Sequence, residues 1–423
     1  MTVSYWQQAH REQSTAYDVV VVGGGIVGCS TAYWLGRSRP SLRVAVVEAR
    51  TLGGGASGRN AGFVLQGTSA DYLTDVKRYG ERTARRLWHF TRTNRDLLAS
   101  ELRGSAFGWK ADGGLQVAGD HEEEHRLQES VSSLRAAGAP VVYLESEKVN
   151  NRVSATGLGG GIFVTTGAVV NPLELVRYLA HESGADLRTH QPVTQIRWDR
   201  NGASLRTPDL ELWGRQLVLS VGPALPSLLP SVSGVVRSVR AQMLATAPAD
   251  TSSIPVPVYS HEGGFYVRQL PDGTLLAGGG RHQHRAAEET DTDRTTPAVQ
   301  ATIERYLHSY YPWTQSLPVR QRWSGTMGFS PDGRPVVGPV PEHPDSVFAT
   351  GFTGHGMGYG FRMGRLLAQR IGGSTRPDGY DLFAASRFTE DKDRPRRGRA
   401  SRGETSRTHP DPEESKSQSS KLR

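Results

Sequence analysis

The apolar residues near the N-terminus follow the order strand, turn, helix, strand. Residues 18–22 form a short continuous run rich in valine, which is typical of a strand buried on both faces. Glycines within residues 23–28 interrupt this run, and residues 26–35 continue with helical character. A second valine-rich run occupies residues 43–47 and ends at Glu48. This order predicts a βαβ unit with a right-handed crossover.

Helical and strand patterns alternate along the rest of the chain. Helices are predicted at residues 71–103, 127–137, 173–182 and 364–371, the third with Asn171 as N-cap and Pro172 at its first position. Strands are predicted at residues 193–198, 217–221 and 347–350, and a hairpin around Asp272 and Gly273 joins residues 265–269 to 274–277. These elements favour an α/β fold with additional antiparallel strands.

The composition is that of a globular protein, with 36% hydrophobic and 22% charged residues in a chain of 423. No run of about 18 apolar residues occurs, so no membrane span is expected. The polar residues 1–16 lack the layout of a secretory signal, which favours a cytoplasmic protein. The single cysteine, Cys29, can form neither an internal disulfide nor a thiolate metal site, and we expect it to be buried in a helix.

The net charge of +8 is shared between the body of the chain and its C-terminal end. Residues 390–423 hold ten Lys or Arg and seven Asp or Glu, a net +3, which leaves +5 for the rest. Because large apolar side chains are scarce there, residues 385–423 are expected to form a disordered basic tail. Arg82, Arg85 and Arg86 cluster at helical spacing and are interpreted as a solvated helix face, so nucleic acid is not favoured as a partner.

The first turn of the chain carries a dinucleotide fingerprint. Gly23, Gly25 and Gly28 fit G-x-G-x-x-G, and Glu48 follows Gly28 by twenty residues. The three glycines allow, in order, the tight turn, the approach of the pyrophosphate and the packing of the helix on the sheet. The pyrophosphate is expected at the helix N-terminus, where free N–H groups favour negative charge. Glu48 is expected to accept hydrogen bonds from the adenosine ribose, which argues against a 2′-phosphate.

A second glycine-rich segment, residues 53–62, indicates which dinucleotide is bound. A simple NAD domain has no evident need for such a loop after its second strand. A flavin enzyme needs backbone that passes close to the pyrophosphate and then beneath the isoalloxazine ring, and small residues permit that approach. The sequence therefore predicts FAD.

Three segments together resemble the D-amino-acid oxidase-like FAD oxidoreductases, of the glycine oxidase, sarcosine oxidase and γ-glutamylputrescine oxidase type. They are residues 19–48, the loop Gly55-Ala56-Ser57-Gly58-Arg59-Asn60-Ala61-Gly62, and a C-terminal set made of Trp323-Ser324-Gly325, residues 330–339 and residues 351–358. The loop and the opening Ser4-Tyr5-Trp6 are similar to the γ-glutamylputrescine oxidase branch. The likeness in layout covers residues 17–375 and is specific for the family but not for the substrate.

The resemblance implies a Rossmann-type FAD-binding domain that is discontinuous in sequence, together with an α+β substrate domain built on an antiparallel sheet. We expect the FAD-binding domain at residues 17–90, 150–230 and 320–375, and the substrate domain at residues 91–149 and 231–319. Residues 1–16 are expected to form a flexible arm.

The fingerprint and the resemblance together imply a set of cofactor contacts on the first turn, the glycine loop, one later strand and the last helix. These are Gly23, Gly25, Ile26, Val27, Gly28, Glu48, Ala49, Arg50, Ala56, Ser57, Arg59, Asn60, Ala61, Val193, Gly222, Gly325, Gly354, His355, Gly356, Met357 and Gly358.

By resemblance, residues 354–358 meet the pyrimidine edge of the flavin. The helix that follows would present its N-terminus to N1/O2, where reduced flavin is anionic. Relatives with covalent flavin have Cys at the position of Gly325 or His near that of Arg59. This chain has neither, so the FAD is expected to be non-covalent.

The resemblance implies oxidation of the C–N bond of a small amine or amino acid to an imine, with hydride transfer to flavin N5. Met327 stands where glycine oxidase has the Arg that binds the substrate carboxylate, and Met cannot replace it. Arg268 on the hairpin is the candidate substitute, with Tyr266 and Tyr359 as further pocket residues. No Lys stands near Ala277 to assist oxygen reduction, so either O2 or another electron acceptor is compatible with the sequence.

Other functions stay open at this point. A related flavoenzyme could oxidise a 2-hydroxy acid or a polyol, and the family also includes a tRNA-modifying flavoenzyme. A non-enzymatic FAD-binding protein is a further alternative. His282 and His284 lack a third ligand nearby, so no metal is expected, and the sequence does not indicate an oligomeric state.

Overall fold

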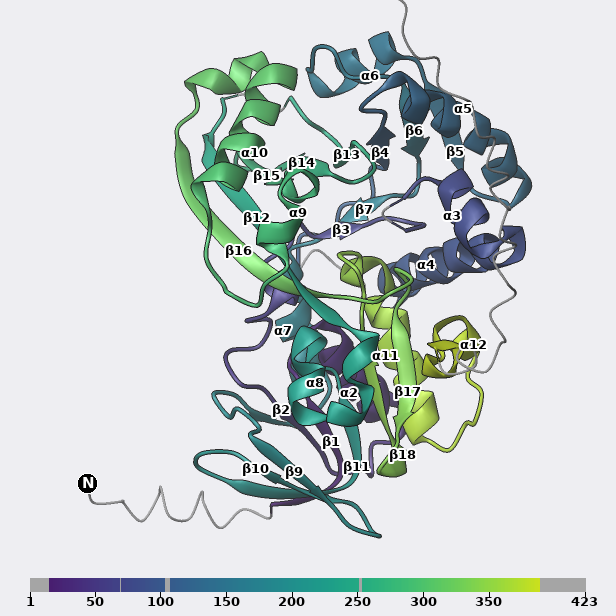
Figure 1. Ribbon diagram of the computed structural model, residues 1–423, viewed down its shortest axis with the longest axis vertical. Coiled ribbons are helices and arrows are strands. Elements are labelled where there is room, and N and C mark those ends of the chain that lie inside the picture. The colour runs from purple at the N-terminus through teal and green to yellow at the C-terminus, as the bar shows by residue number, and fades with distance from the viewer. Residues whose placement is uncertain (1–14, 69, 103–106, 251–252, 389–423) are drawn as a thin grey trace, which may run out of the picture. The chain divides into compact units, whose positions relative to one another are not determined.

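The computed structural model describes residues 15–68, 70–102, 107–250 and 253–388 (Figure 1). Strand β1 (Ala16–Val22), helix α2 (Ile26–Ser38) and strand β2 (Val44–Val47) form the βαβ unit that the sequence predicts. The two strands are parallel, with Val19 opposite Val44 and Val22 opposite Val47. Both are buried on both faces, which explains why their sequences are continuous valine-rich runs rather than alternating ones.

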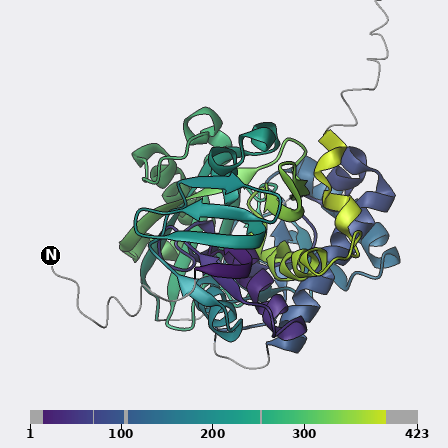
Figure 2. The same cartoon turned by 90° about the horizontal axis from the view of Figure 1, so that it is seen from below.

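The first sheet grows outward from these two strands. Its order is β17-β18-β11-β1-β2-β8, with β10 and β9 attached to β11. The added strands are β8 (Asp186–Arg188), β9 (Gln195–Trp198), β10 (Ala203–Arg206), β11 (Glu211–Leu219), β17 (Val336–Val340) and β18 (His343–Thr350). β8, β11 and β18 run parallel to their neighbours in the centre, whereas β17 is antiparallel to β18. Figure 2 shows this sheet from below.

A second eight-stranded sheet occupies the upper part of Figure 1, in the order β16-β12-β15-β14-β13-β4-β6-β5. Its strands are β4 (Gly114–Val117), β5 (Val141–Leu144), β6 (Gly161–Val164), β12 (Arg237–Pro248), β13 (Val258–Ser260), β14 (Phe265–Gln269), β15 (Thr274–Gly279) and β16 (Val319–Phe329). All neighbours are antiparallel except β13 and β4. The predicted hairpin is the pair β14 and β15, and the mixed α/β class is confirmed.

The remaining elements cover the sheets or connect them. The helices are α3 (Tyr72–Tyr79), α4 (Glu81–Glu101), α5 (His121–Ala136), α6 (Ser146–Val153), α7 (Pro172–Glu182), α8 (Leu225–Leu228), α9 (Arg285–Glu288), α10 (Pro297–Tyr310), α11 (Gly356–Ile371) and α12 (Tyr380–Phe383). A small ribbon of β3 (Phe63–Val64) and β7 (Ala168–Val169) lies between the sheets in Figure 1. Within the described ranges, no helix is both long and apolar enough to cross a membrane.

Several boundaries differ from the sequence prediction for local reasons. The predicted helix 71–103 is two helices, because Gly80 adopts φ +82° between α3 and α4. The helix predicted at 127–137 begins at His121, since the Asp120 side chain accepts the Glu123 N–H and starts it earlier. Asn171 caps α7 as predicted, accepting from Leu173 and Glu174 N–H.

Further boundaries shift at the strand and helix ends near the site. The strand predicted at 193–198 starts only at residue 195, and the one predicted at 217–221 ends at residue 219. The last helix extends upstream from the predicted residues 364–371 to residue 356. The glycines at the beginning of α11 interrupt the helical spacing of apolar residues, so the sequence pattern did not predict this part of the helix.

The two sheets do not follow the predicted domain boundaries everywhere. β6 and β16 belong to the second sheet, although residues 150–230 and 320–375 were assigned to the FAD-binding domain. The boundaries themselves stay a prediction. The predicted flexible arm falls almost wholly on residues 1–14, and the predicted tail on residues 389–423, both outside the described residues.

Helices α2 and α11 cross with their backbones almost in contact. A Cβ on Gly364 would lie 2.4 Å from the Ser30 Cβ, and one on Gly360 would lie 2.8 Å from Ile26 side-chain atoms. The Trp34 indole N–H donates to the Phe361 carbonyl at 3.1 Å across the same crossing. This close approach fixes the spacing and register of the two helices relative to each other.

Substituting Gly364→Ala should therefore destabilise the protein, by about 2–3 kcal/mol, because the added methyl group meets backbone that cannot move. Thermal or chemical unfolding measures the effect. Gly234→Ala is the matched control, since a Cβ there meets nothing within 4 Å. Equal unfolding midpoints for the two variants would contradict the role of this crossing.

Candidate active site

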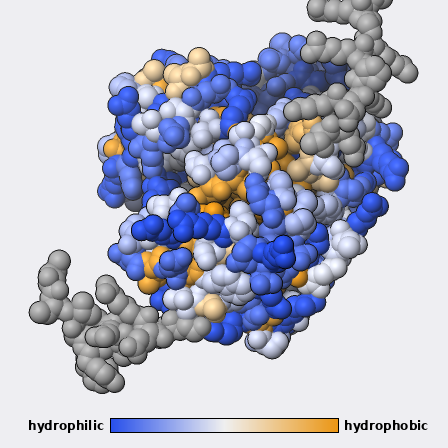
Figure 3. Space-filling view, turned by 60° about the horizontal axis from the view of Figure 1, so that its bottom comes forward, coloured by the Kyte–Doolittle hydropathy of each residue, from blue (hydrophilic) through white to orange (hydrophobic). Residues whose placement is uncertain are grey.

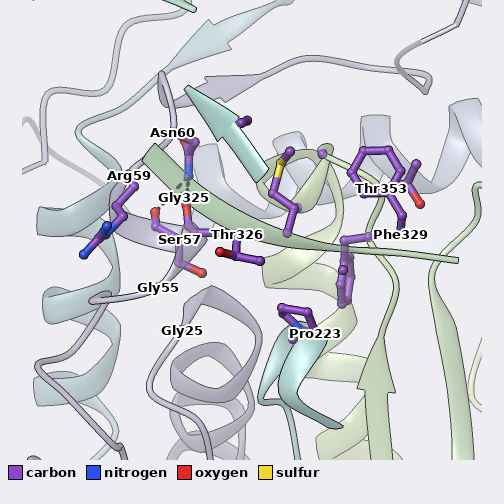
Figure 4. A pocket seen from close by; sticks show the side chains of 18 of the residues that line it. Gly25, Gly55, Ser57, Arg59, Asn60, Pro223, Gly325, Thr326, Phe329 and Thr353 are labelled. Atoms are coloured by element: carbon purple, nitrogen blue, oxygen red, sulfur yellow. Dashed lines mark hydrogen bonds between the residues drawn. The ribbon is translucent and has the colours of Figure 1, made fainter. Parts of the chain in front are cut away.

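A cavity of about 1200 Å³ is lined by residues of both sheets. Val22 and Val47 come from the first sheet, and Met243 and Tyr266 from the second. All the predicted cofactor residues except Gly28 and Gly358 line it. Figure 4 shows one side of the cavity, where β16 passes above the start of α2. On the face shown in Figure 3, hydrophobic side chains gather mainly near the middle of a largely hydrophilic surface.

The glycines of the fingerprint make a close-fitting turn at the start of α2. Gly23 has φ +109°, and a Cβ there would lie 2.5 Å from the Ser220 carbonyl oxygen. Gly28 faces the strand instead of the cavity, because its Cβ would lie 1.9 Å from the Gly23 carbonyl oxygen. Gly25 lies on the cavity side, and its missing side chain leaves backbone open to a ligand. The turn therefore fits a pyrophosphate, as the fingerprint predicts.

Ser57 is held directly against this turn. Its Oγ accepts a hydrogen bond from the Ile26 N–H at 2.9 Å, and a Cβ on Gly25 would lie 2.9 Å from the same oxygen. The sequence suggested that Ser57 lies along the pyrophosphate but not that it satisfies one of the free N–H groups of α2. The hydroxyl therefore satisfies one of the free N–H groups at the start of α2.

Glu48 lines the cavity at the end of β2. One carboxylate oxygen accepts from Gly24 N–H at 2.7 Å and the other from Arg50 N–H at 2.9 Å. These bonds fix the carboxylate and leave lone pairs for ribose hydroxyls. Val193 and Gly222 line the same cavity. Val193 lies just before β9 begins, and Gly222 lies just after β11 ends.

The glycine loop is tied to β16 through Arg59. Its guanidinium donates to the carbonyls of Gly54 and Ser324 and pairs with Asp293 at 2.5 Å. The Trp323 indole N–H donates to the Arg59 carbonyl at 2.8 Å. Asp293, which the sequence analysis missed, also accepts from the Ser324 hydroxyl, and Arg50 lies 3.6 Å away. Arg59 thus lines the cavity with its charge already paired.

Asn60 stabilises the loop from inside. Its side-chain amide donates to the carbonyls of Ala56 and Ser57, and its Oδ1 accepts from Gly62 N–H at 2.7 Å. Figure 4 shows Asn60 and Ser57 close together, on either side of the same part of β16. The loop therefore brings backbone close to a bound cofactor in a fixed shape.

The start of α11 opens onto the same cavity as the start of α2. Gly354, with φ +80°, turns the chain into the helix, and His355, Gly356 and Met357 follow along the cavity. Burial lowers the pKa of His355 to about 4, so its ring is neutral at pH 7. Because α2 and α11 both begin at this cavity, the free N–H groups at their starts favour negative charge within it.

Two predicted residues of this segment point away from the cavity. Gly358 packs against His355 and the Leu65 carbonyl. Tyr359 is fully buried between Phe90 and Phe383, with ring centroids 5.9 Å and 5.8 Å away. Tyr359 is therefore a core residue and not the pocket residue that was predicted, because its ring packs into the buried aromatic cluster and does not line the cavity.

Aromatic side chains line the end of the cavity under the second sheet. The rings of Phe63, Tyr259 and Tyr266 meet edge to face, at 5.0 Å for the first two and 6.0 Å for the tyrosines. Met327 and Phe329 face them from β16. Burial raises the pKa of Tyr259 and that of Tyr266, the latter to about 12. We call this end the aromatic chamber.

The prediction for Arg268 is wrong. Its Nη1 donates to the Ala61 carbonyl at 2.7 Å and to the Val170 carbonyl at 2.8 Å, and the side chain does not line the cavity. Burial lowers its pKa to about 10. Arg268 extends along the second sheet toward the β3–β7 ribbon, where two backbone acceptors hold it. It supports the glycine loop from behind instead of meeting a substrate.

The two histidines for which no metal was expected, and the single cysteine, have separate surroundings. His282 lines the cavity, whereas His284 bonds the Thr302 hydroxyl at 3.0 Å. Among the residues that the structure describes, no group of three His, Cys, Asp or Glu could hold a metal ion. Cys29 is fully buried in α2, as predicted, and does not line the cavity.

A Rossmann-type turn and an aromatic chamber that share one cavity define a flavin-dependent oxidoreductase. The chain belongs to the family of FAD dependent oxidoreductases denoted DAO, which matches residues 18–370. It is therefore an FAD-dependent enzyme, as the sequence predicted.

Individual relatives are distant but match along most of the chain. Gamma-glutamylputrescine oxidoreductase of Escherichia coli K12 is 25% identical over 385 residues, which covers 88% of this chain and 87% of the relative. Glycine oxidase of Geobacillus kaustophilus is 28% identical over 382 residues, with 84% and 93% covered. The crystal structure of glycine oxidase from Bacillus cereus has the same fold, with a TM-score of 0.72, 20% identity and 86% and 97% covered.

Glu48→Gln should raise the Kd for FAD at least about tenfold, because an amide offers one acceptor where two backbone N–H groups need two. Fluorescence titration of flavin-free protein with FAD measures the effect. Glu147→Gln, at an exposed position on α6, should leave the Kd unchanged. An unchanged Kd for Glu48→Gln would remove Glu48 from the cofactor site.

The low pKa of His355 makes stability depend on pH. The unfolded chain takes up a proton on this ring below about pH 6.5, whereas the folded chain does so only near pH 4. Stability is therefore lost as pH falls from 6.5 to 4, by about 3 kcal/mol from this group. His355→Gln should flatten that decline in denaturant unfolding, whereas His121→Gln, at a fully exposed position, should not. A decline equally steep in the two variants would contradict a buried neutral His355.

Proposed function

We propose that this protein oxidises the CH–N bond of a small amine or amino acid to an imine. The single observation that carries the proposal is the shared cavity, in which the dinucleotide turn, the start of α11 and the aromatic chamber are continuous. The names of the relatives, which are oxidases or oxidoreductases of amines and amino acids, support the same class of reaction.

A bound flavin would supply the oxidising chemistry by accepting a hydride from the CH–N carbon, and water would hydrolyse the released imine to a carbonyl compound and a free amine. The chain's own residues bind and orient. The start of α2 and Ser57 hold the pyrophosphate, and the start of α11 presents amide donors to negative charge at the pyrimidine edge.

The aromatic chamber holds the substrate as an uncharged amine. Tyr259, Tyr266 and Phe329 surround it with apolar surface, which excludes water and disfavours an ammonium ion. The raised pKa of each tyrosine keeps its hydroxyl protonated, so it serves as a hydrogen-bond donor. Because a neutral amine has no proton to remove before hydride transfer, the site needs no general base.

The electron acceptor is O2 or another small oxidant. Ala277, where a Lys was sought, is fully buried in β15 and offers no cation to reduced oxygen. A reducing, cytoplasmic compartment fits a chain whose only cysteine is a buried free thiol.

Anaerobic mixing of the flavin-loaded protein with amines and with D- and L-amino acids tests the reaction. At least one of them should bleach the oxidised flavin absorbance, and admission of air followed by a peroxide assay separates oxidase from dehydrogenase. The 2-hydroxy acids and polyols are the matched control. Bleaching by these compounds alone, or by none of the compounds, would overturn the proposal.

The same preparation tests how FAD is held. Acid precipitation should release yellow flavin into the supernatant, because Gly325 and Arg59 offer no atom for a covalent link. Colour retained in the pellet would contradict non-covalent binding.

A further inference from the structure

Arg281 enters the cavity from the end of β15. Gly279 and Gly280, with φ +120° and +73°, turn the chain sharply out of the sheet just before it. A Cβ on Gly279 would lie 2.1 Å from the Gly264 carbonyl oxygen, so only glycine fits this turn. The Arg281 guanidinium carbon lies 4.8 Å from the centre of the Phe329 ring, on which it stacks.

The charge of Arg281 has no partner within the described part of the chain. Its guanidinium makes no hydrogen bond or ion pair there, in contrast to Arg59. The nearby acids are engaged elsewhere: Glu288 with Arg240 at 2.6 Å and Gln242 at 3.1 Å, and Glu289 with Arg237. Asp291 is exposed to solvent.

The surroundings of Arg281 compensate its positive charge only in part. Burial, followed by the charges of Arg285 and Arg237, lowers its pKa more than Tyr266 and Glu288 raise it. His282 also lines the cavity, and burial together with His261 and Arg281 lowers its pKa, so it supplies no counter-charge. A half-buried guanidinium without an anion is costly, and an anionic ligand would remove that cost.

The position of Arg281 is at the flavin end of the cavity. Phe329, under the guanidinium, lies close to the turn before α11, since a Cβ on Gly354 would be 4.0 Å from its ring and 3.7 Å from the Met327 sulfur. Figure 4 shows Phe329 near Thr353 and at the other end of β16 from Arg59. The pyrophosphate side and the Arg281 side are therefore different parts of the cavity.

We propose that Arg281 binds the carboxylate of the substrate, so the substrate is an amino acid or an N-substituted amino acid and not a simple amine or diamine. The inference rests on the proposed function and narrows it. The guanidinium fork matches a carboxylate with two parallel hydrogen bonds. Arg285, exposed at the rim of the same cavity, attracts anions and repels cationic amines.

Carboxylate and carboxamide pairs test the assignment on the flavin-loaded protein. Benzoate and acetate should perturb the flavin absorbance saturably, whereas benzamide and acetamide should not. Arg281→Met should weaken benzoate binding about 100-fold, and Arg281→Lys, which keeps the charge without the fork, about tenfold. FAD content and melting temperature should match those of the unsubstituted protein, which separates ligand binding from folding.

Arg285→Gln is the matched variant at the rim. It should reduce the salt dependence of benzoate binding and change the Kd less than about fivefold at high salt, because a solvent-exposed charge acts by screened attraction. With a substrate found in the anaerobic screen, Arg281→Met should raise KM for the carboxylate far more than for its carboxamide.

Three results would overturn the inference. The first is unchanged benzoate binding in Arg281→Met. The second is loss of FAD instead of benzoate, since Arg281 would then be a cofactor ligand. Bleaching by carboxylate-free amines in a protein that binds no benzoate would overturn it while the proposed function stands. Arg281-dependent benzoate binding in a protein that no amine bleaches would support the anion site while the proposed function fails.

Discussion

The close crossing of α2 and α11 is the constraint on which the site depends. Gly360 and Gly364 let the second helix lie directly on the backbone of the first, and the Trp34–Phe361 hydrogen bond fixes the register. Because side chains do not separate them, the two helix starts open onto one cavity, although 330 residues separate Ile26 from Gly356 in the chain. The positive ends of both dipoles therefore point into a single cavity, which suits a dinucleotide with negative charge at two places.

The second sheet contributes to the cofactor side as well as to the substrate side. Arg59 reaches across to Ser324 on β16 and to Asp293 in the segment before α10, and Trp323 returns a bond to the loop. The glycine loop is thus held from both sheets, and Arg268 supports it from behind. This arrangement lets the loop be rich in glycine and still have one defined shape.

Charge is distributed unevenly in the cavity. Arg50 and Arg59, near the pyrophosphate side, share Asp293, whereas Arg281 has no acid of its own. An arginine whose charge is paired with an acid stabilises the fold, whereas one without such a pair favours the binding of an anion. The same contrast explains how a family fold with one redox chemistry can select different substrates: the selecting charge need only enter the chamber from a different strand.

The sequence by itself determined the βαβ unit, the acid at Glu48 and the glycine loop, because each depends on residues close together in the chain. A valine run, a glycine turn and a strand-ending carboxylate dictate local geometry wherever the rest of the chain lies. Tertiary structure alone decided which arginine lines the cavity. Arg268 and Arg281 belong to the same stretch of chain and look alike in sequence. Arg268 donates hydrogen bonds to two carbonyls from distant segments, whereas Arg281 stacks on the Phe329 ring. A long side chain turns toward whichever partner the fold brings near it.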